Sequence, residues 1–583
     1  MVYTFYSNQE KVKMTNQELA EIFNLLADAL EFKAENPFKI QAYRKASRII
    51  KDFSFDLKEF CKEKPLTAIP GIGEGIAKKI KEYIETGKIS KFDEETKDIP
   101  KGIFEMMKIP YLGPKTLKRA YEKLGVDSLD QLKKVMDDGS LALLQGMGAK
   151  KIERMKETIQ LFETSEIGKK RFVIGDVYPV IEEIISRLKE VTRNVTPCGS
   201  YRRMKETVGD IDLLAISDKG EEVTGFFIKL PFVRNVISVG STKATVVLKT
   251  HDIQVDLRVV KADSFGACLQ YFTGSKAHNI KLRTIAKVKG LKISEYGVFR
   301  GKKKVAGSTE KEVYKSIGLD YIPPEMREDN GEIELAMEHR LPRIVEYNDF
   351  LGDLHIHSKY SDGAESIVEL AKTAKAMGFK YIAICDHSKS VTYAGGLTED
   401  MLLKKNEEID TINEEIKGIS VLKGAEVDIL SNGELDYKDS ILETLDIVIA
   451  AIHQGFRKNV TERFLQAMEN PFVNILAHPT GRLISKRKGY DVNLEKVFEK
   501  AKDEGIILEI NSYFDRLDLD DTNVRRAKSF NLLFSIGTDA HNVGMLKYWR
   551  LGVGIARRAW LTKENVINCY PLPKLKKLLR REK

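Results

Sequence analysis

The chain of 583 residues has little cysteine and no long apolar run. Its five cysteines are scattered without a Cys-x-x-Cys pair, which argues against a disulfide framework or a thiolate zinc site and is typical of a reducing compartment. No stretch approaches the roughly 20 apolar residues of a membrane span, and the first residues lack the apolar core of a signal peptide. We therefore expect a soluble, cytoplasmic protein, a monomer with no membrane partner.

What the chain does have is length and charge. A hydrophobic fraction of 42% suffices for several packed cores, and the length suggests roughly three or four domains. Lys and Arg number 95 against 86 Asp and Glu, a formal net charge of +9. This mild basic excess suits a polyanionic partner but does not identify one.

The hydrophobic pattern changes along the chain. Helical periodicity follows a capping-box spacing at 15–18 and continues to about residue 165. Apolar runs such as DIDLLAI, ATVVLK and IQVDLRVV then predict a β-rich sheet with flanking helices over about 172–260. A charged segment that opens on Pro-Pro, 322–350, predicts a partly helical linker. From 351 onward, short apolar strands alternate with helical stretches, which predicts a parallel α/β architecture.

Three segments in the first third place a Gly-rich hairpin directly before a basic helix: 69–80 (IPGIGEGIAKKI), 109–120 (IPYLGPKTLKRA) and 143–155 (LLQGMGAKKIERM). Glycine permits tight turns, and the exposed N–H groups at the start of the next helix can meet a phosphate. A lone copy is better explained as an ordinary helix–turn–helix joint. Three copies in one basic region favour sequence-independent binding of the DNA backbone, and they resemble helix-hairpin-helix motifs.

Three carboxylates in the middle of the chain suggest a metal site. Asp210 and Asp212 lie two apart in a predicted strand, so both point to one face, and Asp256 lies in a second run that can pair with it. Three convergent carboxylates suit two Mg²⁺ or Mn²⁺ ions that clamp the attacking and departing oxygens of a phosphoryl displacement. The turn at Gly199-Ser200 can hold nucleotide phosphates. A bare Asp-x-Asp is more often an exposed surface strand; the upstream Gly-Ser and the third Asp favour a nucleotidyltransferase.

The segment YFTGSKAHNIKLR (271–283), together with these motifs, resembles a family X DNA polymerase over about 14–320. The resemblance implies a DNA-directed DNA polymerase that takes dNTPs and fills short gaps in gapped or nicked DNA during repair. It implies that Asp210, Asp212 and Asp256 hold the metals and that Asp256 draws the proton of the primer 3′-hydroxyl. The nucleotide contacts that it implies are Gly199, Ser200, Arg203 and Gly209 at the triphosphate, Tyr271, Phe272 and Gly274 at the sugar, Asn279 at the base edge and Arg283 at the template. Without the motif, the aromatic pair is equally well explained by core packing.

The same resemblance bears on the N-terminal region, where some members carry a 5′-deoxyribose phosphate lyase. Lys79 falls at the position of the Schiff-base lysine, and a lowered pKa, to which Lys78 can contribute, would make it nucleophilic. Gly75 stands where better-known lyase members carry another Lys, so binding of a 5′-phosphate without lyase chemistry is the alternative. The DNA contacts expected here are Lys39, Tyr43, Arg44, Gly71, Gly73, Lys78, Gly113 and Lys115.

Six histidines of the C-terminal part each end or closely follow an apolar run: His355, His357, His387, His453, His478 and His541. One such histidine is usually a partly buried structural imidazole. All six, however, share one predicted position, the C-terminal edge of a parallel strand, where α/β barrels place their active sites. Imidazoles mixed with carboxylates suit Zn²⁺, Mn²⁺ or Fe²⁺ better than Mg²⁺.

These residues resemble a PHP (polymerase and histidinol phosphatase) domain over about 350–575, which implies a distorted seven-stranded α/β barrel with three metals. The resemblance assigns His355, His357, Glu426 and Asp539 to the first metal, Glu426, His453 and His478 to the second, and Asp362, His387 and His541 to the third. It implies Mn²⁺-dependent 3′→5′ exonuclease action, with apurinic-site endonuclease or 3′-phosphatase action in some members.

We therefore expect an α/β multidomain chain: a lyase-like, 5′-phosphate-binding helical domain at 1–95, a helix-hairpin-helix subdomain at 96–170, a nucleotidyltransferase palm with a mixed sheet at 171–262, a nucleotide-selection subdomain at 263–321, a linker at 322–350 and a distorted (β/α)7 PHP barrel at 351–583. Two alternatives remain open. The PHP domain could hold metals only as a structural or interaction module. The first half could be a non-templated nucleotidyltransferase for RNA or small molecules, which the Tyr271 turn and the hairpins oppose.

Overall fold

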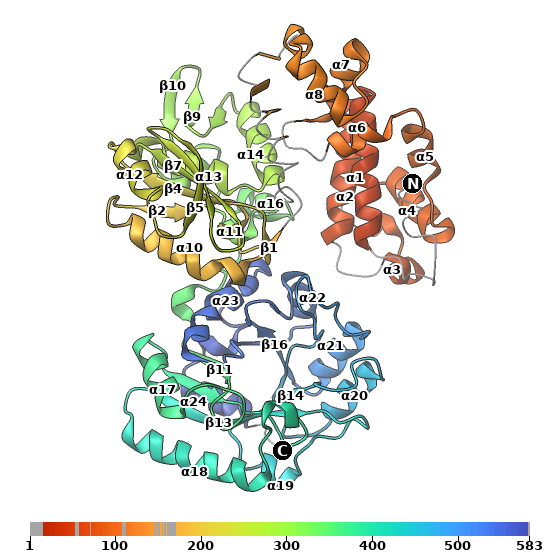
Figure 1. Ribbon diagram of the computed structural model, residues 1–583. Coiled ribbons are helices and arrows are strands. Elements are labelled where there is room, and N and C mark those ends of the chain that lie inside the picture. The colour runs from red at the N-terminus through yellow and green to blue at the C-terminus, as the bar shows by residue number, and fades with distance from the viewer. Residues whose placement is uncertain are drawn as a thin grey trace. The chain divides into compact units, whose positions relative to one another are not determined.

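The computed structural model describes residues 16–580 apart from 53–56, 70, 108–111, 145–146, 149–151, 154, 157–158 and 160–170. The chain divides into two compact units, 1–170 and 171–583. Figure 1 draws the first from red to orange and the second from yellow to blue. The first residue of the predicted capping box, Thr15, and much of the third hairpin, 143–155, lie outside the described residues. None of the described helices combines the length and the apolarity that crossing a bilayer requires.

The first unit is helical wherever it is described. Its helices are α1 (Asn16–Phe32), α2 (Pro37–Asp52), α3 (Leu57–Glu63), α4 (Glu74–Thr86), α5 (Ser90–Thr96), α6 (Lys101–Met106), α7 (Pro114–Leu124) and α8 (Leu129–Asp137), with 3₁₀ turns η2 (Leu66–Ala68) and η3 (Ser140–Leu143). Two apolar clusters hold it together, one around Phe23 and Leu26 on α1 and one around Ile103 and Leu117. Burial of these stripes stabilises helices that are individually short.

The second unit begins with a mixed-sheet region. Its elements are β1 (Phe172–Val173), α10 (Ile174–Leu188), β2 (Val195–Pro197), α11 (Gly199–Arg202), β3 (Thr207–Val208), β4 (Ile211–Ile216), α12 (Gly220–Phe227), β5 (Val233–Val239), β6 (Lys243–Leu248) and β7 (Gln254–Val260). The five-stranded sheet has the order β2-β4-β7-β6-β5, and only the β4–β7 pair is parallel. Strand β7 alternates between buried and half-buried residues, so one face packs on the core and the other stays open.

A three-stranded region follows. It consists of η5 (Ala262–Ser264), α13 (Phe265–Thr273), α14 (Lys276–Val288), β8 (Lys292–Ser294), β9 (Gly297–Arg300), β10 (Lys303–Ala306) and α15 (Glu310–Ser316), and its antiparallel sheet has the order β10-β9-β8. Helix α13 packs tightly on the segment before α15, because a Cβ at Gly266 would lie 2.1 Å from the carbonyl carbon of Thr309. Glycine is required at this close approach.

The segment 322–350, for which the sequence predicts a linker, is packed into the second unit. It carries η6 (Pro324–Met326), α16 (Glu332–Met337) and η7 (Tyr347–Asp349). Its charged side chains are buried against partners: Arg327 is fully buried with Nη1 2.6 Å from Glu310 Oε1, and the buried Glu332 places Oε1 2.7 Å from His278 Nδ1. Buried charges of this kind require partners.

The remainder forms the barrel region. Its strands are β11 (Gly352–Ile356), β12 (Tyr381–Ile384), β13 (Ser420–Asp428), β14 (Ile447–Ala451), β15 (Ile475–Leu476), β16 (Ile507–Asn511) and β17 (Phe534–Gly537). Its helices are α17 (Ile367–Ala376), α18 (Glu399–Glu415), α19 (Asp439–Leu442), α20 (Val460–Ala467), α21 (Leu494–Asp503), α22 (Asp521–Lys528), α23 (Trp549–Arg558) and α24 (Leu572–Leu579), and its 3₁₀ turns are η8 (Thr392–Ala394), η9 (Val543–Tyr548) and η10 (Ile567–Cys569).

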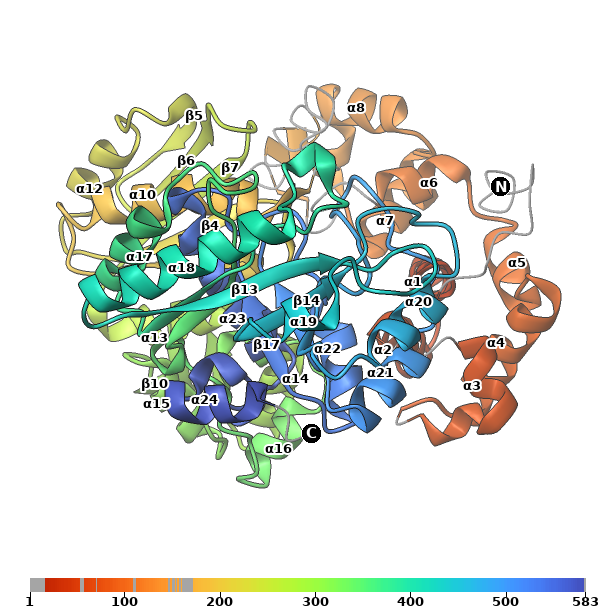
Figure 2. The same ribbon diagram turned by 90° about the horizontal axis from the view of Figure 1, so that it is seen from below.

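The seven strands of this region run parallel in sequence order from β11 to β17. A parallel bridge between Ile356 and Ala540 brings the two edges together, so the sheet nearly closes into a barrel. Most of its strands are buried along their whole length, as expected for parallel strands that are covered on both faces. Figures 1 and 2 show α17, α18, α20, α21 and α22 around the outside of the strands.

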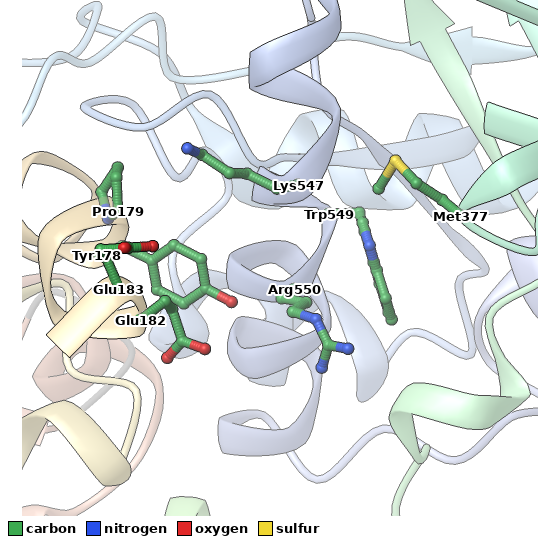
Figure 3. Close-up of a pocket in the computed structure, with 8 residues that line it drawn as sticks. All are labelled: Tyr178, Pro179, Glu182, Glu183, Met377, Lys547, Trp549 and Arg550. Carbon is green, nitrogen blue, oxygen red and sulfur yellow. The ribbon is translucent and has the colours of Figure 1, made fainter. Parts of the chain in front are cut away.

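The mixed-sheet and barrel regions belong to one unit and touch through side chains. Arg558 of α23 is buried and bonds to the Arg203 carbonyl oxygen at 2.8 Å, to Glu328 at 3.1 Å and to Asp521 at 2.7 Å. A cavity of about 450 Å³ lies where α10 meets α23. Figure 3 shows Tyr178 and Glu182 facing Arg550 across it. None of the predicted metal ligands lines this cavity, so it is separate from both candidate sites.

Candidate active sites

The three predicted metal carboxylates come from β4, β7 and the turn before β4. Asp212 and Asp256 are direct register partners in the parallel β4–β7 pair, so their side chains leave the same face of the sheet. Asp210 precedes β4 by one residue and is the same-face neighbour of Asp212. The alternation of β7 leaves Asp256 half-buried on the open face.

The electrostatics of these groups show that they are close together. Burial, Asp210 and Asp256 raise the pKa of Asp212 to about 7. Burial and the charge of Asp256 raise the pKa of Asp210. Like charges in one site oppose ionisation, and divalent cations relieve that repulsion. A set of hard oxygen ligands on adjacent strands therefore fits Mg²⁺ or a similar ion.

Neighbours on β6 and β7 hold the Asp256 carboxylate. Thr245 donates to it, Gln254 Nε2 donates at 3.0 Å, and Lys243 Nζ lies 3.2 Å away. Sequence reasoning missed these three residues. The alternation of β7 could have indicated Gln254, which lies two residues from Asp256 on the same face. Thr245 and Lys243 could not be predicted, because only the fold shows that β6 lies beside β7.

The predicted phosphate-binding residues surround α11. Gly199 has φ +60° and starts this helix, and a Cβ there would lie 3.2 Å from Asp212 Oδ2, so the turn runs directly beside the carboxylates. Ser200 follows within α11, and Gly209 lies in the turn before Asp210. Arg203 bonds to Glu328 at 3.1 Å and to the Thr273 carbonyl oxygen at 2.5 Å. Its guanidinium therefore already has an anionic partner.

The predicted nucleotide-selection residues lie on α13, α14 and the turn between them. The rings of Tyr271 and Phe272 meet edge to face at 5.2 Å, and both are half-buried. Asn279 Nδ2 donates to the Tyr271 carbonyl oxygen at 2.7 Å, which fixes the turn. Gly274 ends α13 with φ +70°, a conformation that favours glycine. Arg283 is exposed on α14.

A further residue connects these two groups. The Arg258 guanidinium stacks over the Phe272 ring at 4.3 Å, and its charge lowers the pKa of Asp212 against the larger effects that raise it. Arg258 lies two residues after Asp256 on the same face of β7. That spacing could have identified it from the sequence.

In the barrel region, all nine predicted ligands gather at one end of the strands. His355 lies in β11 with His357 directly after it, and Glu426 lies in β13. The other ligands follow strand ends: His387 after β12, His453 after β14, His478 after β15, and Asp539 and His541 after β17. Asp362 comes from the loop between β11 and α17. This is the C-terminal edge expected for an α/β active site.

Glu426 lies at the centre of the cluster. Its Oε1 lies 2.9 Å from His478 Nε2 and 3.2 Å from His453 Nε2. Its Oε2 lies 2.9 Å from His387 Nδ1 and 3.6 Å from both His355 Nε2 and His357 Nε2. The carboxylate is therefore placed to bridge cations.

The ligand atoms form three overlapping groups, each with all atoms within 4.8 Å: His357, Asp362, His387 and His541; His355, His357 and Asp539; His387, Glu426 and His453. Among the described residues, Asp210, Asp212 and Asp256 do not form such a group within 4.8 Å. In the barrel, Nε2 of His355 and Nε2 of His357 face each other at 3.3 Å. Glu426 Oε2 and His387 Nδ1 are both buried and 2.9 Å apart, but they are not aligned for a hydrogen bond. Buried lone pairs that face one another fit divalent cations.

The charges of the clustered ligands shift one another's pKa values. Burial lowers the pKa of His387, but Glu426 and Asp362 together raise it to about 10. Burial, His387 and His541 lower the pKa of His357 to about 4. Burial would raise the pKa of Glu426, but His453, His387 and His355 bring it well below its usual range. The carboxylates thus favour positive charge in the cluster, which divalent cations supply.

Two ligands have strained backbones. His478 has φ +29° and Asp539 has φ +53°, in the left-handed region that non-glycine residues seldom adopt. Strain of this kind persists where the surrounding contacts hold a residue in place, and such positions are common at functional sites.

A second layer of polar residues, which sequence reasoning missed, supports the ligands. Glu509 Oε1 lies 2.6 Å from His355 Nδ1, and Asn511 Nδ2 donates to Asp539 Oδ2 at 3.1 Å. Asp428 Oδ1 lies 3.3 Å from His453 Nδ1. Carboxylates of this kind fix the tautomer and orientation of metal-binding imidazoles. The acidic residue within the apolar strand ILEIN could have indicated Glu509 from the sequence.

In the first unit, Lys79 lies on α4 and donates to the Gly75 carbonyl oxygen at 3.1 Å, with its ammonium 5.8 Å from the centre of the Tyr43 ring. Burial lowers the pKa of Lys79, Glu82 opposes this, and Lys91, Lys39 and Lys78 lower it further. Arg44, predicted for a 5′-phosphate, is instead paired with Asp28 at 2.8 Å and Glu31 at 2.6 Å. Lys39 lies 3.6 Å from Glu35.

Two of the predicted hairpins lead into basic helices. Gly71 has φ +91°, and Gly73 is the N-cap of α4, which carries Lys78. Gly113 is the N-cap of α7, whose first turn holds Lys115. Neither cap residue has a side chain, so no N-cap side chain bonds to the first N–H groups of α4 and α7, and Pro114 at the start of α7 has no N–H.

Five family models match the chain. A helix-hairpin-helix domain matches 14–89, and a SAM-like helix-hairpin-helix tandem matches 103–161. DNA polymerase beta palm and thumb models match 174–273 and 268–328, and a PHP domain matches 353–513.

Three relatives are similar to different shares of the chain. The DNA polymerase/3′-5′ exonuclease PolX of Bacillus subtilis is 38% identical over 97% of this chain and 100% of its own length. DNA polymerase lambda of Arabidopsis thaliana is 26% identical over 54% of this chain and 62% of its own length. A probable phosphatase of Thermoanaerobacter is 30% identical over 40% of this chain and 95% of its own length.

Proposed function

The chain belongs to the family of the DNA polymerase/3′-5′ exonuclease PolX, and on that premise we propose that its two clusters are two separate reaction sites, one for DNA synthesis and one for 3′-end removal. The observation that carries the proposal is the pairing of Asp212 with Asp256 on one sheet and, on another, the gathering of eight imidazoles and carboxylates with His478 2.9 Å from Glu426.

At the synthesis site, we assign Asp210, Asp212 and Asp256 to Mg²⁺ or Mn²⁺. These ions would neutralise the triphosphate and lower the cost of developing charge. Asp256 accepts the proton of the primer 3′-hydroxyl, whose oxygen bonds to the α-phosphorus as the bond to pyrophosphate breaks. The turn at Gly199, Ser200 and Gly209 binds the triphosphate. Arg203 joins it by exchanging its Glu328 partner for a phosphate oxygen.

Tyr271, Phe272 and Gly274 select the deoxyribose, Asn279 contacts the base edge, and Arg283 contacts the template. The half-buried, edge-to-face pair and the tether from Asn279 support this assignment, because a fixed aromatic turn makes a firm steric boundary. We propose dNTPs and gapped or nicked DNA as the substrates.

At the barrel site, the nine ligands hold divalent ions, which we propose to be Zn²⁺, Mn²⁺ or Fe²⁺ because imidazole nitrogen predominates among the donors. Such ions supply charge stabilisation to a phosphodiester and activate water. Water bonds to the terminal phosphorus, the bond to the 3′-oxygen of the preceding nucleotide breaks, and a nucleoside 5′-monophosphate leaves. The similarity to a probable phosphatase supports a second reaction, removal of a 3′-phosphate, at the same site.

For the first unit, we propose binding of a downstream 5′-phosphate by Lys79, Lys39 and Lys78. The gathering of these ammonium groups supports it, since burial lowers the pKa of Lys79 and the charges of Lys39 and Lys78 lower it further. The starts of α4 and α7, which follow Gly73 and Gly113, contact the DNA backbone. Arg44 is held by Asp28 and Glu31, so it steadies α2 against α1 and is less available to DNA.

Paired substitutions test the assignment of two sites. Asp256→Ala should reduce primer extension to background and leave 3′-end removal near the wild-type rate, and His453→Ala should do the reverse. Loss of both reactions with either substitution would contradict two separate sites.

A further inference from the structure

An exposed tyrosine stands at the mouth of the barrel site. Tyr393 lies on η8 and is 73% exposed, although it is a large aromatic residue on a well-packed loop. The loop runs from Ser388 to Leu397, directly after the ligand His387. Isolated exposed aromatics are common on protein surfaces, so the exposure of Tyr393 becomes informative only together with the position of the loop that carries it.

The loop is tied to the metal ligands at its base. Ser388 N donates to the Glu426 carbonyl oxygen at 3.0 Å, and Leu397 N donates to the His387 carbonyl oxygen at 2.8 Å. A Cβ at Gly396 would lie 2.0 Å from the Ser388 carbonyl oxygen, so the two arms of the loop are in close contact. The loop is therefore a firm support for Tyr393.

The same loop extends across the ligand cluster. Gln454, next to His453, donates from Nε2 to the Ser390 carbonyl oxygen at 3.0 Å. On the other side, a Cβ at Gly395 would lie 3.3 Å from the carbonyl oxygen of Ser361, the neighbour of Asp362. The tip of the loop thus lies between two groups of ligands.

The charges of two ligands also act on the Tyr393 hydroxyl. Partial burial raises the pKa of Tyr393, Glu426, Asp428 and Asp362 raise it further, and Arg516 lowers it. A second tyrosine, Tyr513, reaches the same cluster from the loop after β16, with its ring 6.0 Å from the ring of His541 and at a right angle to it. Two aromatic rings from non-neighbouring strands therefore border the site.

The ligands themselves lie below this rim. His355 and His357 are fully buried and Glu426 is 1% exposed, so a phosphodiester must enter the barrel mouth to reach them. A strand freed from its complement can do this more readily than a duplex, and its terminal base then needs a surface to replace the lost stacking. Aromatic side chains provide such a surface for any base.

We infer that Tyr393 is a stacking platform for the 3′-terminal base of a single DNA strand that enters the barrel site. This inference rests on the proposed exonuclease function and adds a specificity residue to it.

The test uses the full-length chain with Tyr393→Ala and Tyr393→Phe, and Tyr296→Ala as a matched control, since Tyr296 is 66% exposed in a turn of the three-stranded region. Two single-stranded oligonucleotides serve as substrates, one ending in a normal 3′ nucleotide and one ending in an abasic residue. The phosphodiester chemistry is the same in both, and only the first has a base to stack.

Tyr393→Ala should raise the KM for the normal end by roughly 5- to 100-fold, the range expected for loss of one stacked base. It should leave removal of the abasic residue unchanged, while Tyr393→Phe should retain most of the wild-type behaviour. Equal slowing on both substrates would show a merely structural role, and no slowing on either would show no role; both results overturn the inference.

A binding measurement separates this inference from the proposed function. In the His453→Ala background, a 3′-terminal 2-aminopurine should change fluorescence on binding, and adding Tyr393→Ala should remove that change. If the wild-type chain degrades no DNA, the exonuclease proposal fails, and this fluorescence result still decides the role of Tyr393. An unaltered fluorescence change overturns the inference.

Discussion

Glu509 Oε1 lies 2.6 Å from His355 Nδ1, and both side chains are almost completely buried. The contact leaves Nε2 of His355 facing Glu426 and His357, where a cation would bind. The Glu509 carboxylate also accepts from His478 N at 3.0 Å, so it orients two ligand positions at once. Carboxylates behind metal-binding imidazoles raise their basicity and fix their rings.

Glu509→Gln should therefore weaken metal binding at the barrel by roughly 10- to 100-fold while preserving size. Mn²⁺ titration of 3′-end removal would measure this, with primer extension as the internal reference. Glu499→Gln, on the exposed side of α21, is the control. An unchanged metal requirement in Glu509→Gln would contradict the role of this pair.

Tyr271→Ala should reduce the preference for dNTPs over rNTPs by roughly 10-fold. The reason is that removal of a steric boundary typically lowers discrimination between two similar substrates by about this factor. Steady-state incorporation of matched dNTP and rNTP pairs opposite one template base would show it. Tyr271→Phe keeps the ring that packs against Phe272 and should keep the preference. Equal discrimination in the Ala variant and the wild type would rule out a steric gate at this position.

Lys79→Met should lower the affinity for gapped DNA that carries a 5′-phosphate and have little effect when the gap carries a 5′-hydroxyl. The expected loss is several-fold, since one charge-assisted phosphate contact is removed. Fluorescence anisotropy at a fixed salt concentration would measure both substrates. Lys189→Met, an exposed lysine after α10, removes the same charge elsewhere. An equal loss on the two substrates would contradict 5′-phosphate recognition.

Two guanidiniums contact the Glu310 carboxylate, and this arrangement predicts that the folded protein loses stability in acid. Burial raises the pKa of Glu310, but Arg327 and Arg202 outweigh it and lower the pKa to about 2, from a usual value of 4.5. Because the pKa of Glu310 is lower in the folded protein than in the unfolded chain, its carboxylate stabilises the fold at pH values above the unfolded-state pKa. That stability is lost as the pH falls from about 5 towards 2. The contribution at neutral pH is about 3 kcal/mol.

Glu310→Gln should lower the Tm at pH 7 and flatten its decline between pH 5 and pH 2, because the group that takes up the proton is gone. Scanning calorimetry of the two proteins across this range would test it. A Glu310→Gln variant whose Tm falls with acid as steeply as that of the wild type would contradict the assignment of the acid effect to Glu310.

The sequence predicted the fold class and the reaction because those rest on local patterns. The period of two placed Asp210 and Asp212 on one face, and the register of β4 and β7 then brought Asp256 beside Asp212. The repeated order of apolar run then histidine predicted a parallel barrel, which the seven parallel strands confirm.

What local patterns could not predict depends on contacts between distant segments. The charged segment around Arg327 suggested a linker, yet Arg327 is buried and bonds to Glu310, which lies 17 residues earlier. Likewise, the pairing of Arg44 with Asp28 and Glu31 depends on how α1 and α2 pack. Charge in a sequence indicates exposure only where no opposite charge is folded against it.

The most direct test of two separate cation sites is anomalous diffraction from crystals of the full-length chain grown with Mn²⁺. We expect peaks beside Asp212 and Asp256 and a separate group of peaks around Glu426. In Glu426→Gln crystals, the second group should weaken and the first should persist. Absence of a peak beside either Asp212 or Glu426 in the wild-type crystals would contradict the account.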